Sequence, residues 1–117
     1  MSNVKEPNSE EILRNIKGDI IRCLEGFGIK VKKMFLFGSR ARGNFKLESD
    51  CDVLIVLNKD LTQPEKKELW SKVSKVLHKH FPYSSFDIII KSTGSFEREK
   101  AVVNTISNEA YLEGVEI

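Results

Sequence analysis

Apolar residues near the start of the chain recur every three or four positions, a pattern that predicts an amphipathic helix. The stripe begins after Asn8 and consists of Ile12, Leu13, Ile16, Ile20, Cys23, Leu24 and Phe27. Asn8 and Glu11 have the spacing of a capping box at the start of this helix. Gly26 and Gly28 surround the last apolar position, so we expect the helix to end there.

Three later segments have the pattern of β-strands. Residues 31–37 and 85–90 are rich in β-branched and aromatic residues, and residues 50–57 end in an uninterrupted apolar run. Aspartate is depleted in strands, yet Asp50 and Asp52 open the second segment and a further aspartate lies inside the third. These carboxylates therefore need a reason other than strand formation.

Two more helices are predicted between and after these strands. Thr62 is a typical N-cap, with Glu65 three residues later and Pro64 in the first turn. The helix that they start continues with apolar residues at helical spacing until Phe81 and Pro82 stop it. A last helix, with a modest apolar stripe, is predicted from Phe96 to about Ser107.

The predicted order is helix, strand, strand, helix, strand, helix. This order indicates an α/β (α+β) fold in which a small mixed β-sheet packs against helices. A chain of 117 residues has room for one domain, which we place at 9–117 after a flexible N-terminus at 1–8.

Composition bears on whether the protein binds nucleic acid or metal, forms disulfides or spans a membrane. The 19 basic and 17 acidic residues give a net charge of +2, which offers no strong support for a nucleic-acid partner. Cys23 and Cys51 lie in apolar patterns without metal-ligand spacing, as expected of reduced thiols in a cytoplasmic protein. His78 and His80 suit the end of a helix better than a metal site. The sequence has no apolar run long enough to suggest a membrane span.

The three strand aspartates can act together. Alternation along a strand puts Asp50 and Asp52 on one face, and Asp87 can join them if its strand is the neighbour. Two unit charges about 5 Å apart repel by about 3 kcal/mol at an effective dielectric constant of about 20, so this carboxylate triad needs a cation. Mg²⁺ prefers carboxylate and phosphate oxygens, and two such ions assist displacement at phosphorus.

A glycine turn that follows the first strand suits the other half of this chemistry. Gly38 allows a close backbone approach to an anion, and Ser39 can add its hydroxyl to exposed amide donors. Arg40 and Arg42 can contact phosphate in a bidentate manner. We call these four residues the phosphate turn. Each feature alone has an ordinary structural explanation, but their order along the chain favours a triphosphate site.

The phosphate turn, followed by the paired aspartates, resembles the nucleotidyltransferase superfamily that includes DNA polymerase beta, and in its size the minimal nucleotidyltransferase family. The resemblance covers nearly the whole chain. It implies transfer of a nucleoside monophosphate, with AMP from ATP favoured, to an acceptor hydroxyl. Gly38 and Ser39 would hold the triphosphate, and the carboxylate triad would bind two Mg²⁺ ions. Asp87 would also help to deprotonate the acceptor.

The resemblance also suggests partners. Larger members carry a helical region that holds the base and the acceptor, so here we expect a partner chain or a homodimer to supply it. Some minimal members are antitoxins that attach AMP to a small helical HEPN protein, and this is the favoured role. The segment 96–117 is the candidate interface. Two alternatives remain: a catalytically silent module that neutralises a helical partner by binding, and an antibiotic-type enzyme with a small-molecule acceptor.

Overall fold

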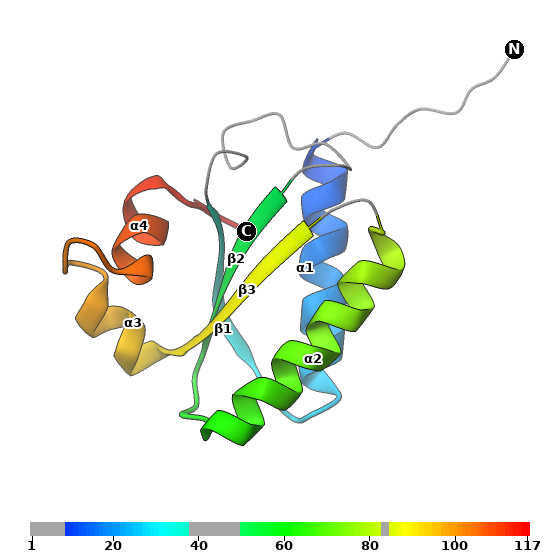
Figure 1. Ribbon diagram of the computed structural model, residues 1–117, viewed down its shortest axis with the longest axis horizontal. Helices are drawn as coiled ribbons and strands as arrows, with labels where there is room; N and C mark the ends of the chain where they lie inside the picture. The colour runs from blue at the N-terminus through cyan, green and yellow to red at the C-terminus, as the bar shows by residue number, and fades with distance from the viewer. Residues whose placement is uncertain (1–8, 38–49, 83–84) are drawn as a thin grey trace, which may run out of the picture.

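The computed structural model describes residues 9–37, 50–82 and 85–117 (Figure 1). They form four helices and four strands: α1 (Ser9–Glu25), β1 (Val31–Phe37), β2 (Asp50–Leu57), α2 (Gln63–His80), β3 (Ser85–Ser92), α3 (Thr93–Glu99), α4 (Ile106–Glu113) and β4 (Val115–Glu116). The predicted fold, a small mixed sheet packed against helices, is confirmed. Within this part of the chain, no helix is long and apolar enough to cross a membrane.

The strands form one sheet in the order β3-β2-β1-β4. β1 pairs antiparallel with both β2 and β4, whereas β2 pairs with β3 in parallel. Parallel neighbours need a crossover connection, and α2 provides it. The three predicted strands are confirmed, with β3 two residues longer than expected. The short β4 was not predicted.

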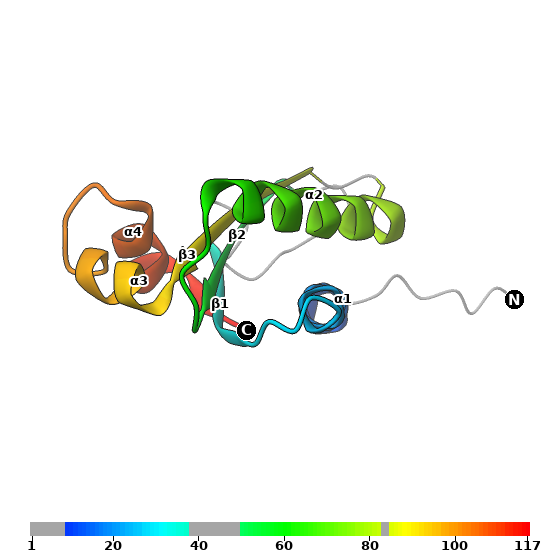
Figure 2. The same ribbon diagram turned by 90° about the horizontal axis from the view of Figure 1, so that it is seen from below.

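The two faces of the sheet carry different layers (Figures 1 and 2). α1 and α2 cover one face, where the larger apolar cluster includes alternate residues of β2, namely Cys51, Val53, Ile55 and Leu57. α3 and α4 cover part of the other face, where a smaller cluster contains Leu54 and Val56. Phe96 of α3 stacks on Phe35 of β1 with ring centroids 5.3 Å apart. Strand alternation therefore divides β2 between two separate cores.

The predicted ends of the first two helices agree with the structure where it describes them. Thr62 and Glu65 form a capping box, with the Thr62 amide donating to the Glu65 carboxylate at 2.9 Å. α1 ends at Glu25, and Gly28 adopts a φ of 72°, a left-handed conformation that glycine reaches without strain. The predicted capping box at Asn8 lies outside the described residues.

The single helix predicted for 96–107 is wrong, because α3 and α4 are separate. Val102 and Val103 are β-branched residues with weak helix propensity, and they follow the end of α3. Asn104 then adopts a φ of 72°, which a continuing helix cannot accommodate. Thr105 caps the new helix by accepting a hydrogen bond from the Asn108 amide. The left-handed Asn104 and the N-cap at Thr105 therefore divide the segment into two helices, although its weak apolar stripe predicted one.

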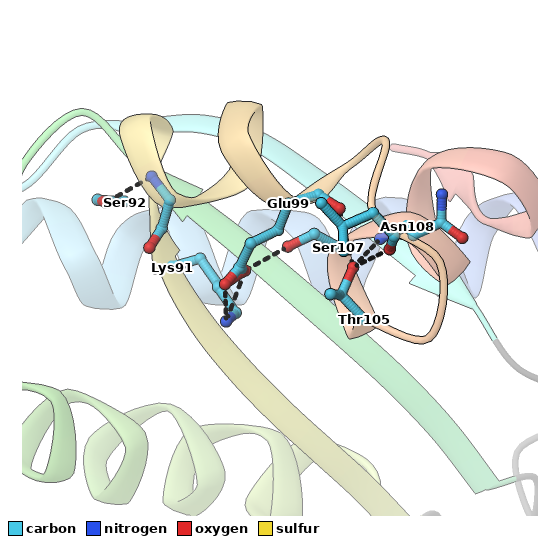
Figure 3. Close-up of polar contacts among 8 residues, drawn as sticks. Lys91, Ser92, Glu99, Thr105, Ser107 and Asn108 are labelled. Carbon is cyan, nitrogen blue, oxygen red and sulfur yellow. Dashed lines mark hydrogen bonds and ion pairs between the residues drawn. The ribbon is translucent and has the colours of Figure 1, made fainter.

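Polar contacts fix α3 and α4 to the end of β3 (Figure 3). Lys91 on β3 lies 2.8 Å from a carboxylate oxygen of Glu99, and the Ser107 hydroxyl donates to the same carboxylate at 3.1 Å. The Thr105 hydroxyl lies 2.8 Å from the Glu99 carbonyl oxygen. Hydrogen bonds to Lys91 and Ser107 outweigh the desolvation that opposes them and lower the pKa of Glu99. This carboxylate therefore joins three elements.

A buried carboxylate joins the two helices on the opposite face. Asp19 of α1 is only 5% exposed, and one of its oxygens lies 2.6 Å from Nδ1 of His80 on α2. Arg22 Nη2 donates to its other oxygen, also at 2.6 Å. This role of Asp19 was not predicted from the sequence. Its signal was available, because Asp19 lies in the apolar stripe at helical spacing from Ile16.

Candidate active site

Two of the predicted site residues lie side by side on neighbouring strands. Asp52 of β2 pairs in parallel register with Asp87 of β3. Adjacent strands are about 4.8 Å apart, and registered residues point to the same face. Asp87 was expected to join the other aspartates only if its strand neighbours β2, and β3 does neighbour β2.

Both carboxylates lie on the face that carries the smaller core. Asp52 shares its face of β2 with Leu54 and Val56, and Asp87 shares its face of β3 with Ile89, which also packs against this cluster. Asp87 is exposed and Asp52 is partly exposed. Phe37, the registered neighbour of Asp52 on β1, is still buried in this cluster, whereas Asp87 on the other side of Asp52 is exposed. Within the described residues, the accessible member of the pair is therefore the one on β3.

Asp50 is the first residue of β2 and pairs in register with Ser85, two positions before the Asp52–Asp87 pair. Its side chain lies outside the described part of the structure. Two of the three members of the predicted triad are thus described with their side chains.

Cys51 lies between the two aspartates in sequence but belongs to the other face. It is 1% exposed within the larger core. Burial raises the pKa of Cys51 to about 12, and the negative charge of Asp52 contributes in the same direction. The thiol therefore stays protonated at neutral pH, and its surroundings suit a packing residue rather than a metal ligand or nucleophile.

β1 delivers the chain to this end of the sheet. Its last residue, Phe37, pairs in register with Asp52. The phosphate turn, Gly38, Ser39, Arg40 and Arg42, comes next in the sequence and lies outside the described residues. The last described residue before that turn therefore lies beside Asp52.

The donor set fits a hard divalent cation. Asp52 and Asp87 offer carboxylate oxygens, which Mg²⁺ prefers, and their exposure leaves room for phosphate and water ligands. Among the side chains that the structure describes, no group of three or more His, Cys, Asp or Glu is gathered to hold a metal without other ligands. A cation at this pair would complete its coordination with water and with oxygens from Asp50 or a bound triphosphate.

Lys91 was missed by the sequence analysis although it lies on the same face. It follows Asp87 by four residues, so the alternation of β3 puts both on one side of the strand. The ion pair with Glu99 engages its ammonium group, which gives Lys91 a structural role in anchoring α3. The alternation of side chains along residues 87–91 would have predicted that Lys91 lies on the same face as Asp87.

Comparison with known proteins agrees with this architecture. The family model described as a nucleotidyltransferase domain matches residues 19–117. A Methanocaldococcus jannaschii protein, provisionally named a protein adenylyltransferase, is 32% identical over 107 residues, which make up 92% of this chain and 96% of that protein. Spectinomycin 9-adenylyltransferases from Staphylococcus aureus strains Mu50 and N315 are 36% identical over 74 residues, 63% of this chain and 26% of each enzyme.

The family match covers both strands that carry the paired aspartates and the segment that links β1 to β2. The archaeal relative matches at nearly full length on both sides, so the likeness is not confined to one motif. The chain belongs to the nucleotidyltransferase domain family and is an enzyme of that class.

Proposed function

We propose that this protein transfers AMP from ATP, in a Mg²⁺-dependent reaction, to a hydroxyl group on a partner protein. The observation that carries the proposal is the registered pair Asp52 and Asp87, placed where β1 leads into the phosphate turn. Two adjacent carboxylates repel each other, and a bound cation offsets this repulsion. A triphosphate held beside them would bring that cation.

Each site residue has a role in this scheme. Gly38 and Ser39 would hold the triphosphate, while Arg40 and Arg42 would contact its phosphate oxygens. Asp50, Asp52 and Asp87 would hold two Mg²⁺ ions. When bound, these ions neutralise the triphosphate charge and polarise its oxygens.

The transfer itself replaces a phosphoanhydride bond of ATP with a phosphoester bond to the acceptor. The acceptor oxygen forms a bond to the α-phosphorus of ATP, and the bond from that phosphorus to the bridging oxygen of pyrophosphate breaks. Asp87 accepts the proton of the acceptor hydroxyl. Its exposure lets an acceptor approach from solvent, as a general base requires.

A protein acceptor is favoured by the comparisons. The archaeal relative that matches along 96% of its own length is provisionally named a protein adenylyltransferase. Exposed apolar side chains at the far end of the chain support a protein-binding role. They are Val102, Val103, Ile106, Tyr111 and Leu112. We propose an antitoxin role in which the partner is a small helical protein of the HEPN type, bound to one copy or a homodimer of this chain.

A small-molecule acceptor is the second candidate. It is favoured by the 36% identity to the spectinomycin 9-adenylyltransferases. The matched segment is only 26% of each of those enzymes, so we rank this possibility below a protein acceptor.

Calorimetric titration of ATP tests the triphosphate site. We expect the wild type to bind ATP with Mg²⁺ and not with EDTA, and the Asp50→Asn/Asp52→Asn variant to lose this binding. Asp60→Asn is the matched control, because Asp60 is an exposed carboxylate beyond the end of β2. ATP binding that ignores both EDTA and the variant would contradict the proposed site.

Transfer of α-phosphate-labelled ATP tests the reaction. A small helical protein of the HEPN type and spectinomycin are offered as separate acceptors. Label on the protein supports the first candidate, and label on spectinomycin alone supports the second. An Asp52→Asn protein that still silences the partner without labelling it would instead establish the silent binding module.

A further inference from the structure

A groove runs along β3 and is lined by the residues that directly follow Asp87 in the sequence. It has a volume of about 680 Å³ and lies between α2 and β3. In the sheet formed by the described residues, β3 is an edge strand. Figure 2 shows α2 alongside this strand.

The strand backbone itself faces the groove. Ile88, Ile89 and Ile90 all line it, although successive side chains of a strand point to opposite faces. Ile88 and Ile90 belong to the larger core, while Ile89 packs against the smaller one. Three consecutive residues can share one groove only where it follows the strand edge. An edge strand offers unpaired N–H and C=O groups, which suit an added strand from another chain.

The helical wall of the groove is aromatic and basic. Trp70 is 47% exposed, and Lys66 and Lys67 line the same groove one turn earlier on α2. A large apolar side chain of a bound segment can pack against Trp70. Acidic side chains of that segment can pair with the two lysines, so the groove favours an extended and acidic occupant over a basic one.

These charges disfavour a second copy of the chain as the occupant. An isologous dimer through two β3 edges would bring the same surface of both copies together. Lys66 and Lys67 of one copy would then approach the same lysines of the other, and like charges repel.

We propose that the β3 edge groove binds an extended acidic segment of the partner protein by strand addition. Asp87 directly precedes Ile88 on this edge strand, so such a segment passes beside Asp87, the registered neighbour of Asp52. Resting on the proposed function, this assigns the groove as the site that delivers the acceptor hydroxyl. The bound segment would be a tail or loop of the partner.

Fluorescence of Trp70 reports on this groove directly, because it is the only tryptophan in the chain. The probe is a short capped peptide in which valine alternates with glutamate. We expect it to shift the emission saturably and to bind about tenfold more tightly than the same peptide with lysine at the glutamate positions. N-methylation of its alternate amides should remove binding, because strand addition needs those donors.

Variants of α2 provide the matched comparison. Lys66→Glu/Lys67→Glu should abolish or reverse the preference for the acidic peptide. Lys72→Glu/Lys75→Glu, which makes the same charge change at exposed positions further along α2, should leave it intact. Far-ultraviolet circular dichroism of both variants checks the helix content.

Three results would overturn the proposal. They are equal binding of both peptides, undiminished binding of the N-methylated peptide, and an emission shift that depends on protein concentration alone, which would identify a second copy as the occupant. The peptides carry no hydroxyl side chain, so their binding does not require transfer. Transfer to a protein without peptide binding would reject the groove proposal but support the proposed enzymatic function. Peptide binding without transfer would support the groove proposal but reject the proposed function.

Discussion

Asp52 and Asp87 are registered neighbours on two parallel strands, with like charges on the same face of the sheet. Like charges in directly opposed strand positions are destabilising. We predict that Asp87→Asn leaves the free energy of unfolding unchanged or raises it by up to about 1 kcal/mol, while AMP transfer falls by at least about a hundredfold. Urea unfolding and a labelled-ATP assay measure the two effects.

The control for this prediction is Asp60→Asn, which removes an exposed carboxylate away from the register pair. It should change neither quantity. A large loss of stability in Asp87→Asn would mean that the carboxylate holds the fold together, and the catalytic assignment would fail.

Asp19 should matter for stability, because it is buried and accepts contacts from two helices. Asp19→Asn keeps the shape but removes the charge that faces Arg22 and His80. We expect the free energy of unfolding to fall by about 1–3 kcal/mol. His80→Gln should show part of this loss, whereas His78→Gln, at an exposed position two residues earlier, should show almost none. Equal effects at the two histidines would contradict the α1–α2 link.

Cys51 should be unreactive in the folded protein. Its pKa of about 12 leaves almost no thiolate at pH 8, and its side chain is 1% exposed. In a Cys23→Ser variant Cys51 is the only thiol, since the chain has two cysteines. We expect a thiol reagent to label it only as fast as the protein unfolds. Rapid labelling in the absence of denaturant would contradict the burial.

Glu99 should make stability depend on pH in the acidic range. Its pKa is lowered from the ordinary value of 4.5, chiefly by the hydrogen bond to Lys91. A lowered pKa in the folded state stabilises the protein above the unfolded pKa, and this contribution disappears as pH falls through the folded value. Glu99→Gln should therefore be less stable than the wild type at pH 7, with the difference shrinking towards pH 3.

Urea unfolding across that pH range measures this difference. Glu68→Gln, at an exposed glutamate on α2, is the control and should give a small difference at every pH. A constant deficit for Glu99→Gln would show that the side-chain amide disturbs packing rather than charge pairing.

The sequence predicted most of the fold where local signals were strong. The apolar runs of β1 and β2 and the Thr62 capping box each determine their element through nearby residues. The break between α3 and α4 was missed, because the decisive events are the left-handed conformation of Asn104 and the new cap at Thr105. The weak apolar stripe across this segment predicts one continuous helix and gives no sign of either event.

Tertiary pairing explains the other differences. β4 is two residues long and forms a strand only because it pairs with β1. Local strand propensity does not predict such a pairing. The adjacency of Asp52 and Asp87 could be expected only conditionally, since strand order is a property of the whole sheet. The edge groove was not predicted, because it depends on α2 and β3 lying together.

The division of β2 between two cores has a consequence for its tolerance to mutation. Cys51, Val53 and Ile55 face one layer, and the residues between them face the other. A saturation scan along β2 should therefore show alternation only at residues 51–53, because Leu54 and Val56 are buried in the smaller core and should tolerate substitution no better than their neighbours. Substitutions at odd positions should reduce the amount of folded protein, whereas substitutions at Asp52 should spare abundance and remove activity. At the start of β2, neighbouring residues would thus separate the requirements of folding, at Cys51 and Val53, from those of activity, at Asp52.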